Sequence, residues 1–72
     1  MYYVESIEGN RVNVFDINTK ALYWQCKVTG IKAVTGAAVT NEYMLEVAGE
    51  GGKSKMYNLK TRKLVKVITD KI

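Results

Sequence analysis

The chain has 72 residues, 47% of them hydrophobic, a formal charge of +4, one cysteine, and neither histidine nor proline. One cysteine excludes an intrachain disulfide and the lack of histidine excludes an ordinary zinc site, although one core in so short a chain rarely supplies more than about 3 to 5 kcal/mol. The composition therefore predicts a single domain over residues 1–72 that gains stability by associating with other copies.

Short segments rich in β-branched and aromatic residues alternate with turn signals along the whole chain, which is typical of an all-β domain without helices. In chain order, the strands are expected at residues 2–7, 11–17, 21–28, 31–39, 43–48, 53–59 and 63–69. Every connection between them is too short for the crossover that parallel neighbours need. We therefore expect an antiparallel meander of about seven strands.

An internal repeat appears when the sequence is compared with itself at an offset of 42 residues. VFDINTKAL at 14–22 then meets MYNLKTRKL at 56–64. In each of the two matched segments, an Asp or Asn side chain can accept a hydrogen bond from a backbone N–H of the following turn. A Thr hydroxyl in the same turn can add a second hydrogen bond. We assign repeat one to about residues 1–42 and repeat two to about 43–72. The matched turn residues are Gly9 with Gly51, Asp16 with Asn58, and Thr19 with Thr61.

The segment YYVESIEGNRVNVFDINTKALYW at 2–24 resembles a repeat of the quinoprotein-type (PQQ-like) β-propellers, which are related in shape to WD-repeat propellers. Its Glu-Gly turn, its Asp-x-x-Thr turn and the closing Trp24 follow that pattern. Lys20 and Arg62 stand where the pattern has a turn glycine, and Lys66 stands where a second tryptophan would be. Since no vicinal cysteine pair is present, we carry over neither a quinone cofactor nor a catalytic residue.

The resemblance implies two propeller-like blades of three and four strands, the first lacking its inner strand. Closed propellers have about 4 to 8 blades, so we expect a homo-oligomeric ring of two to four copies. Residues 1–52 carry six acidic and four basic residues, whereas residues 53–72 carry one acidic and seven basic, a difference that would steer head-to-tail association. Trp24 is expected to anchor neighbouring sheets rather than to stack on a ligand. The alternative fold is a small SH3-like or OB-like barrel.

The residues that could carry chemistry form no recognisable constellation. The seven carboxylates match no catalytic or metal-binding motif, and GEGGKSK at 49–55 lacks the spacing of a phosphate-binding loop. Without a histidine to activate it, Cys26 is expected to be a buried hydrophobe. We therefore predict no enzyme activity, no metal and no cofactor. The glutamates of MYYVESIEGN do not suit an export signal, and no apolar run is long enough to span a bilayer.

The sequence favours a non-enzymatic interaction or assembly module that self-associates and binds a larger protein partner, such as a small phage or bacterial accessory protein. We expect it in the cytoplasm, or in the host cytoplasm or virion if a phage encodes it, without contact to a membrane. The alternative is a nucleic-acid-binding protein, because basic residues flank Tyr57 in the C-terminal half. These basic residues are Lys53, Lys55, Lys60, Arg62, Lys63 and Lys66.

Overall fold

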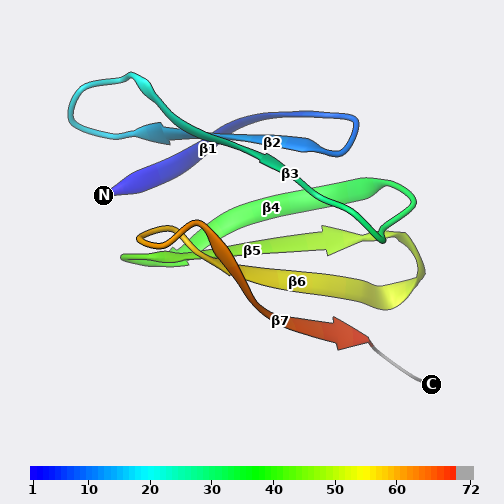
Figure 1. The fold of residues 1–72 in the computed structure, drawn as a ribbon. Coiled ribbons are helices and arrows are strands. Elements are labelled where there is room, and N and C mark those ends of the chain that lie inside the picture. The colour runs from blue at the N-terminus through cyan, green and yellow to red at the C-terminus, as the bar shows by residue number, and fades with distance from the viewer. Residues whose placement is uncertain (70–72) are drawn as a thin grey trace.

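Two antiparallel sheets make up the computed structural model, which describes residues 1–69 (Figure 1). Sheet 1 has the order β1-β2-β3, with β1 at Tyr2–Glu8, β2 at Arg11–Asp16 and β3 at Leu22–Lys27. Sheet 2 has the order β4-β5-β6-β7, with β4 at Val34–Asn41, β5 at Met44–Gly49, β6 at Lys53–Asn58 and β7 at Lys63–Thr69. The all-β fold and the meander of three plus four strands are thereby confirmed.

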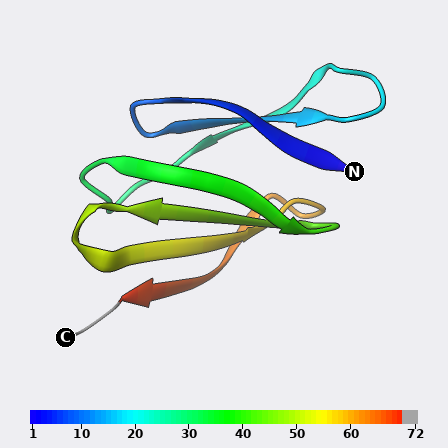
Figure 2. The same ribbon diagram turned by 180° about the vertical axis from the view of Figure 1, so that it is seen from behind.

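The sheets are stacked layers and not parts of one closed barrel. Among the described residues, every strand pairs only with strands of its own sheet, so the alternative of an SH3-like or OB-like barrel is wrong. Strands β1 and β4 lie closest across the layers. Figures 1 and 2 both place β7 on the edge of sheet 2 that is farthest from sheet 1. This edge strand is exposed along most of its length.

The link between the sheets differs from the expected strand at 31–39. Strand β4 begins only at Val34, because Ile31 turns into the core and is 4% exposed. The Asn10 side-chain amide donates a hydrogen bond to the Ile31 carbonyl at 3.0 Å and fixes this crossing. A second difference is the one-turn 3₁₀ helix η1 at Glu50–Gly52, which stands where a plain hairpin turn was expected.

One hydrophobic core fills the space between the sheets. Sheet 1 contributes side chains from β2 and β3, and sheet 2 contributes side chains from β5 and β6. The fully buried core residues, each 0% exposed, are Val12, Val14 and Cys26 from sheet 1, Leu45 and Val47 from sheet 2, and Leu59 directly after β6. Neither sheet has a core of its own, so each depends on the other for burial.

The turns after β2 and β6 share one hydrogen-bonding pattern. Asp16 Oδ1 accepts the backbone N–H groups of Asn18 at 2.8 Å and Thr19 at 3.2 Å. Asn58 Oδ1 accepts those of Lys60 at 2.8 Å and Thr61 at 3.1 Å. An acceptor at this position satisfies two turn donors that the strands leave unpaired.

The same two turns also share their backbone conformation. Lys20 and Arg62 have φ values of 63° and 59° and are the only residues other than glycine with positive φ in the described chain. Both lie where the propeller pattern has glycine, which adopts this conformation without steric cost. The ladder between the flanking strands shifts register at matching places, between Val14 and Phe15 and between Met56 and Tyr57.

Candidate functional site

Strand pairing defines which face of each sheet is covered. In sheet 1, Val4, Val14 and Trp24 form one row across the strands, on the face that packs against sheet 2. The residues 42 positions later, Glu46, Met56 and Lys66, form the equivalent row in sheet 2. That row lies on the face turned away from sheet 1, because its neighbours Leu45 and Val47 point into the core. We call these equivalent faces the front of sheet 1 and the front of sheet 2.

The opposite faces follow the same rule. Leu45, Tyr57 and Leu64 form a row on the back of sheet 2, which is the face that covers the front of sheet 1. The equivalent row on the back of sheet 1 consists of Tyr3, Phe15 and Leu22, and this face is open. The two sheets therefore pack front to back, which leaves one open front on sheet 2 and one open back on sheet 1.

Specific contacts fix this front-to-back interface. The Trp24 ring meets the Tyr57 ring edge-on, with 5.8 Å between the ring centroids. The Tyr23 hydroxyl donates a hydrogen bond to the Leu59 carbonyl at 2.6 Å. The Lys55 ammonium donates to the Thr29 carbonyl. Trp24 thus lies between the sheets, and its half-buried ring is an intramolecular contact.

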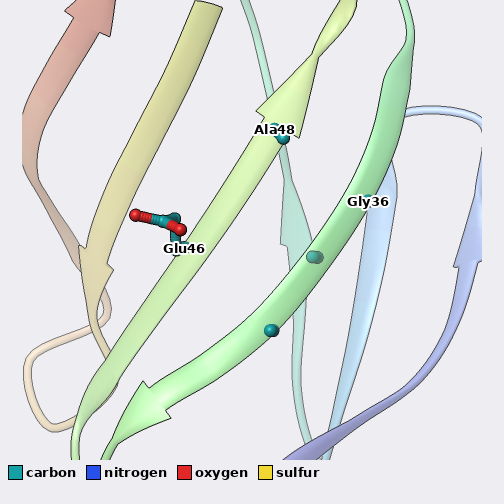
Figure 3. A pocket seen from close by; sticks show the side chains of 5 residues that line it. Gly36, Glu46 and Ala48 are labelled. Atoms are coloured by element: carbon teal, nitrogen blue, oxygen red, sulfur yellow. The ribbon is translucent and has the colours of Figure 1, made fainter.

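The open front of sheet 2 carries a shallow hollow of about 150 Å³. Small residues on β4 and β5 form it, and the Glu46 carboxylate projects at its side (Figure 3). Its lining consists of Gly36, Ala37, Ala38, Glu46 and Ala48. Because Ala38 pairs with Glu46 and Gly36 with Ala48, the hollow runs across neighbouring strands and can accept a larger side chain from outside.

The open back of sheet 1 presents aromatic rings beside a polar ladder. The rings of Tyr3 and Phe15 lie 6.0 Å apart, and Leu22 is 55% exposed. Next to them, the Asn13 side chain donates to the Ser6 hydroxyl at 3.0 Å and accepts from the Gln25 amide at 2.9 Å. These hydrogen bonds link the three polar side chains into one row beside the aromatic row.

Tyrosines and basic residues also gather at the end of the molecule where β6 turns into β7. The rings of Tyr2 and Tyr23 stack with centroids 4.2 Å apart, and Tyr43 lies 6.4 Å from Tyr2. The Arg62 guanidinium lies 4.5 Å from the Tyr23 centroid, and the Lys60 ammonium lies 5.6 Å from that of Tyr43. We call these five residues the basic aromatic end.

The six basic residues singled out in the sequence do not share one surface. Lys60, Arg62 and Lys63 lie at or beside the basic aromatic end, whereas Lys53 begins β6 at the opposite end of the sheet. Lys55 contacts the link between the sheets and Lys66 lies on the front of sheet 2. The tyrosine cluster was missed because Tyr2, Tyr23 and Tyr43 are about 20 residues apart and meet only through the stacking of the sheets.

The observed sheets change the charge argument for head-to-tail steering. Residues 1–33, which include sheet 1, carry four basic and three acidic residues, and residues 34–69 carry six and three. Both parts are net positive, because Glu46 in β5 and the connecting residues Glu42 and Glu50 fall in the same part of the chain as the C-terminal basic residues. The charge difference between residues 1–52 and 53–72 therefore does not coincide with the division into two sheets, and head-to-tail steering stays a prediction.

Cys26 lies in the core between the sheets as a free thiol. Burial raises the pKa of this thiol to about 11, against a smaller lowering by a hydrogen bond with Tyr57 and by the charge of Lys55. Burial also raises the pKa of Tyr57 to about 12, with a further contribution from Cys26. A protonated, inaccessible thiol is a poor nucleophile and a poor metal ligand.

No protein-family model, curated protein or solved structure matches the chain. Within residues 1–69, no three cysteine or carboxylate side chains gather in a way that would hold a metal ion, and no helix is long and apolar enough to span a membrane. The resemblance to a propeller repeat stays a prediction, and the open faces and the basic aromatic end are the candidate sites.

Proposed function

We propose that the chain is a non-enzymatic assembly module that associates with copies of itself and presents its loop ends to a larger protein partner. The observation that carries this proposal is the front-to-back packing, which leaves an unmatched open face on each sheet. In a small protein with one shared core, covering these faces would add the burial that the chain cannot supply alone.

A propeller-like ring is the assembly that this arrangement favours. The strands of sheet 1 recur in sheet 2 at the 42-residue offset, and the Asx turn and the register shift beside it recur with them. Two to four copies stacked by their faces would supply the four to eight blades of a closed ring. Contacts through faces leave the turns at both ends of the sheets free for a partner.

The mass of the native protein in solution tests this function. We expect light scattering coupled to size exclusion, at micromolar concentration, to give two to four times the chain mass of 8.1 kDa. The mass should fall toward that of one chain on dilution, because a noncovalent assembly obeys mass action. A mass of one chain at all accessible concentrations would overturn the proposal.

Nucleic-acid binding is the second candidate, and the basic aromatic end favours it. Arginine and lysine beside stacked tyrosines provide phosphate contacts and ring surfaces for bases. Fluorescence anisotropy with labelled single-stranded and double-stranded oligonucleotides should then show binding that weakens steeply with salt. Arg62→Gln should reduce the binding, whereas Lys53→Gln at the other end of the sheet should not. No binding at low salt would remove this candidate.

A further inference from the structure

We propose that the open front of sheet 2 docks onto the open back of sheet 1 in a second copy of this chain, and that it repeats the front-to-back packing found between the two sheets. The inference rests on the proposed self-association and specifies its geometry. It predicts a single kind of contact between copies, in which the front of sheet 2 of one copy meets the back of sheet 1 of the next. Every copy therefore has one open front and one open back.

The internal interface provides the template. The front of sheet 1 is covered by the back of sheet 2, and the two fronts are equivalent along the central row, where Val4, Val14 and Trp24 correspond to Glu46, Met56 and Lys66. Beyond Val4 a register shift in β1 turns Ser6 to the back of sheet 1, whereas the corresponding Ala48 lies on the front of sheet 2. The same packing operation applied again would place sheet 1 of another copy against the front of sheet 2. Such a heterologous contact closes into a ring when the rotation allows it.

The side chains in the two faces differ from those in the internal interface in a compensating way. Tyr3 stands at the position of Leu45, which is fully buried inside the chain, and a tyrosine needs more room than a leucine. On the opposing front, Gly36, Ala38 and Ala48 provide a hollow of about 150 Å³. The hollow lies on β4 and β5, and β4 has no counterpart in sheet 1, so the internal interface has no equivalent of this space. It offers the larger tyrosine the room that close packing requires.

The central row of the contact is also chemically matched. Inside the chain, Trp24 on the front meets Tyr57 on the back. Between copies, Lys66 takes the place of Trp24 and Phe15 takes the place of Tyr57. A lysine ammonium over an aromatic ring is attracted to its face, and the neighbouring Met56 thioether also packs well on rings. The front of sheet 2 thus suits an aromatic back, which sheet 1 presents.

Two variants, each with one blocked face, test this geometry. Ala48→Arg fills the hollow on the front, and Tyr3→Arg puts a charge into the aromatic row on the back. Asn18→Arg introduces the same side chain in an exposed turn away from both faces and is the matched control. Circular dichroism checks that each variant folds, and Ala38→Arg and Phe15→Arg replace any variant that does not.

Each blocked variant alone should have the mass of one chain, because every contact requires an intact front and an intact back. An equimolar mixture should form a 1:1 dimer through the intact front of one variant and the intact back of the other, while the control keeps the wild-type mass. If only one variant dissociates the assembly, or if the mixture stays monomeric, this geometry is wrong although self-association stands. A monomeric wild type would instead overturn the proposed function itself.

Discussion

Cys26 couples the stability of the fold to alkaline pH. In the folded chain burial raises the pKa of this thiol from about 9 to about 11, so the folded state holds a proton that the unfolded state releases between these values. Stability should therefore be complete below pH 9 and should fall by about 3 kcal/mol as the pH rises to 11.

Urea unfolding at pH 8, 9 and 10 measures this loss. Cys26→Ala should be less stable than the wild type at pH 8 because it leaves a small cavity, but its stability should change less between pH 8 and pH 10. Tyr57 does not obscure the comparison, because its raised pKa affects stability only above pH 10. Equal pH slopes for the wild type and the variant would show that the thiol does not carry the effect.

Lys20 occupies a backbone conformation that costs energy for any residue other than glycine. With φ at 63°, it pays a steric cost of about 1 kcal/mol that glycine avoids. Lys20→Gly should therefore raise the free energy of unfolding by about 0.5 to 1 kcal/mol, measured by urea titration.

Two further variants separate the causes. Lys20→Ala keeps the strained backbone and removes the side chain that lies over Tyr3, so it should not stabilise the fold. Asn18→Gly in the same turn, where φ is not positive, should be neutral or destabilising. A gain in stability from Asn18→Gly as large as that from Lys20→Gly would refute the explanation by backbone strain.

Local chemistry explains why the turns could be predicted at the residue scale. The Asp16 and Asn58 acceptors act on groups two and three residues away, so the sequence alone specifies their partners. The Tyr23 hydroxyl reaches the Leu59 carbonyl across 36 positions, and no local pattern indicates such a contact. Predictability in this chain therefore falls with the sequence distance between partners.

At the scale of elements, a glycine is required at position 49, at the end of β5, because the link between the two sheets passes close to its backbone. A Cβ atom at this position would lie 2.0 Å from Ile31 Cγ2 and 3.1 Å from the Ala33 carbonyl oxygen. Gly49→Ala should therefore displace the link between the sheets and lower the free energy of unfolding by about 1 to 3 kcal/mol.

Gly36 in β4 provides the comparison. A Cβ atom there meets nothing of its own chain within 4 Å, so at concentrations too low for copies to associate, Gly36→Ala should be neutral or stabilising by up to about 1 kcal/mol. Urea titration of both variants at one protein concentration measures the difference. Equal stability of the two variants would mean that the link adapts to the added methyl group without cost.

The start of β4, beside this close approach, is the strand boundary that the sequence predicts least well. Alternation and turn residues placed most strand boundaries within one or two residues, but β4 begins three residues later than expected. The segment IKAV begins and ends with a β-branched residue, which favours a strand. Ile31 instead packs into the core, where the chain crosses from sheet 1 to sheet 2. Tertiary packing overrides a local preference at this point.

For the whole molecule, the decisive property is the register that assigns each residue to a front or a back. Successive strand residues alternate between faces, so a shift by one residue would move Leu45 and Val47 to the open side. The repeat at 42 residues already indicated that two sheets would be alike. It did not indicate which face each would bury, because that depends on how the link at 28–33 directs sheet 2 over sheet 1.

Because each sheet buries its apolar side chains only against the other, the chain should unfold as one unit. Trp24 fluorescence reports on the interface and circular dichroism on both sheets, so their urea transitions should coincide. Val12→Ala in sheet 1 and Val47→Ala in sheet 2 remove equivalent groups from fully buried positions. Each should shift both transitions equally, by about 2 kcal/mol at a fixed protein concentration.

Val65→Ala on the outer edge is the control for these core variants. Val65 is 51% exposed, so its truncation should cost clearly less than either core substitution. If Val12→Ala moved the Trp24 transition while the β-sheet signal kept its wild-type midpoint, sheet 2 would be stable alone. That result would contradict the shared core, because an independent sheet needs buried contacts of its own, and the back of sheet 2 finds them only on sheet 1.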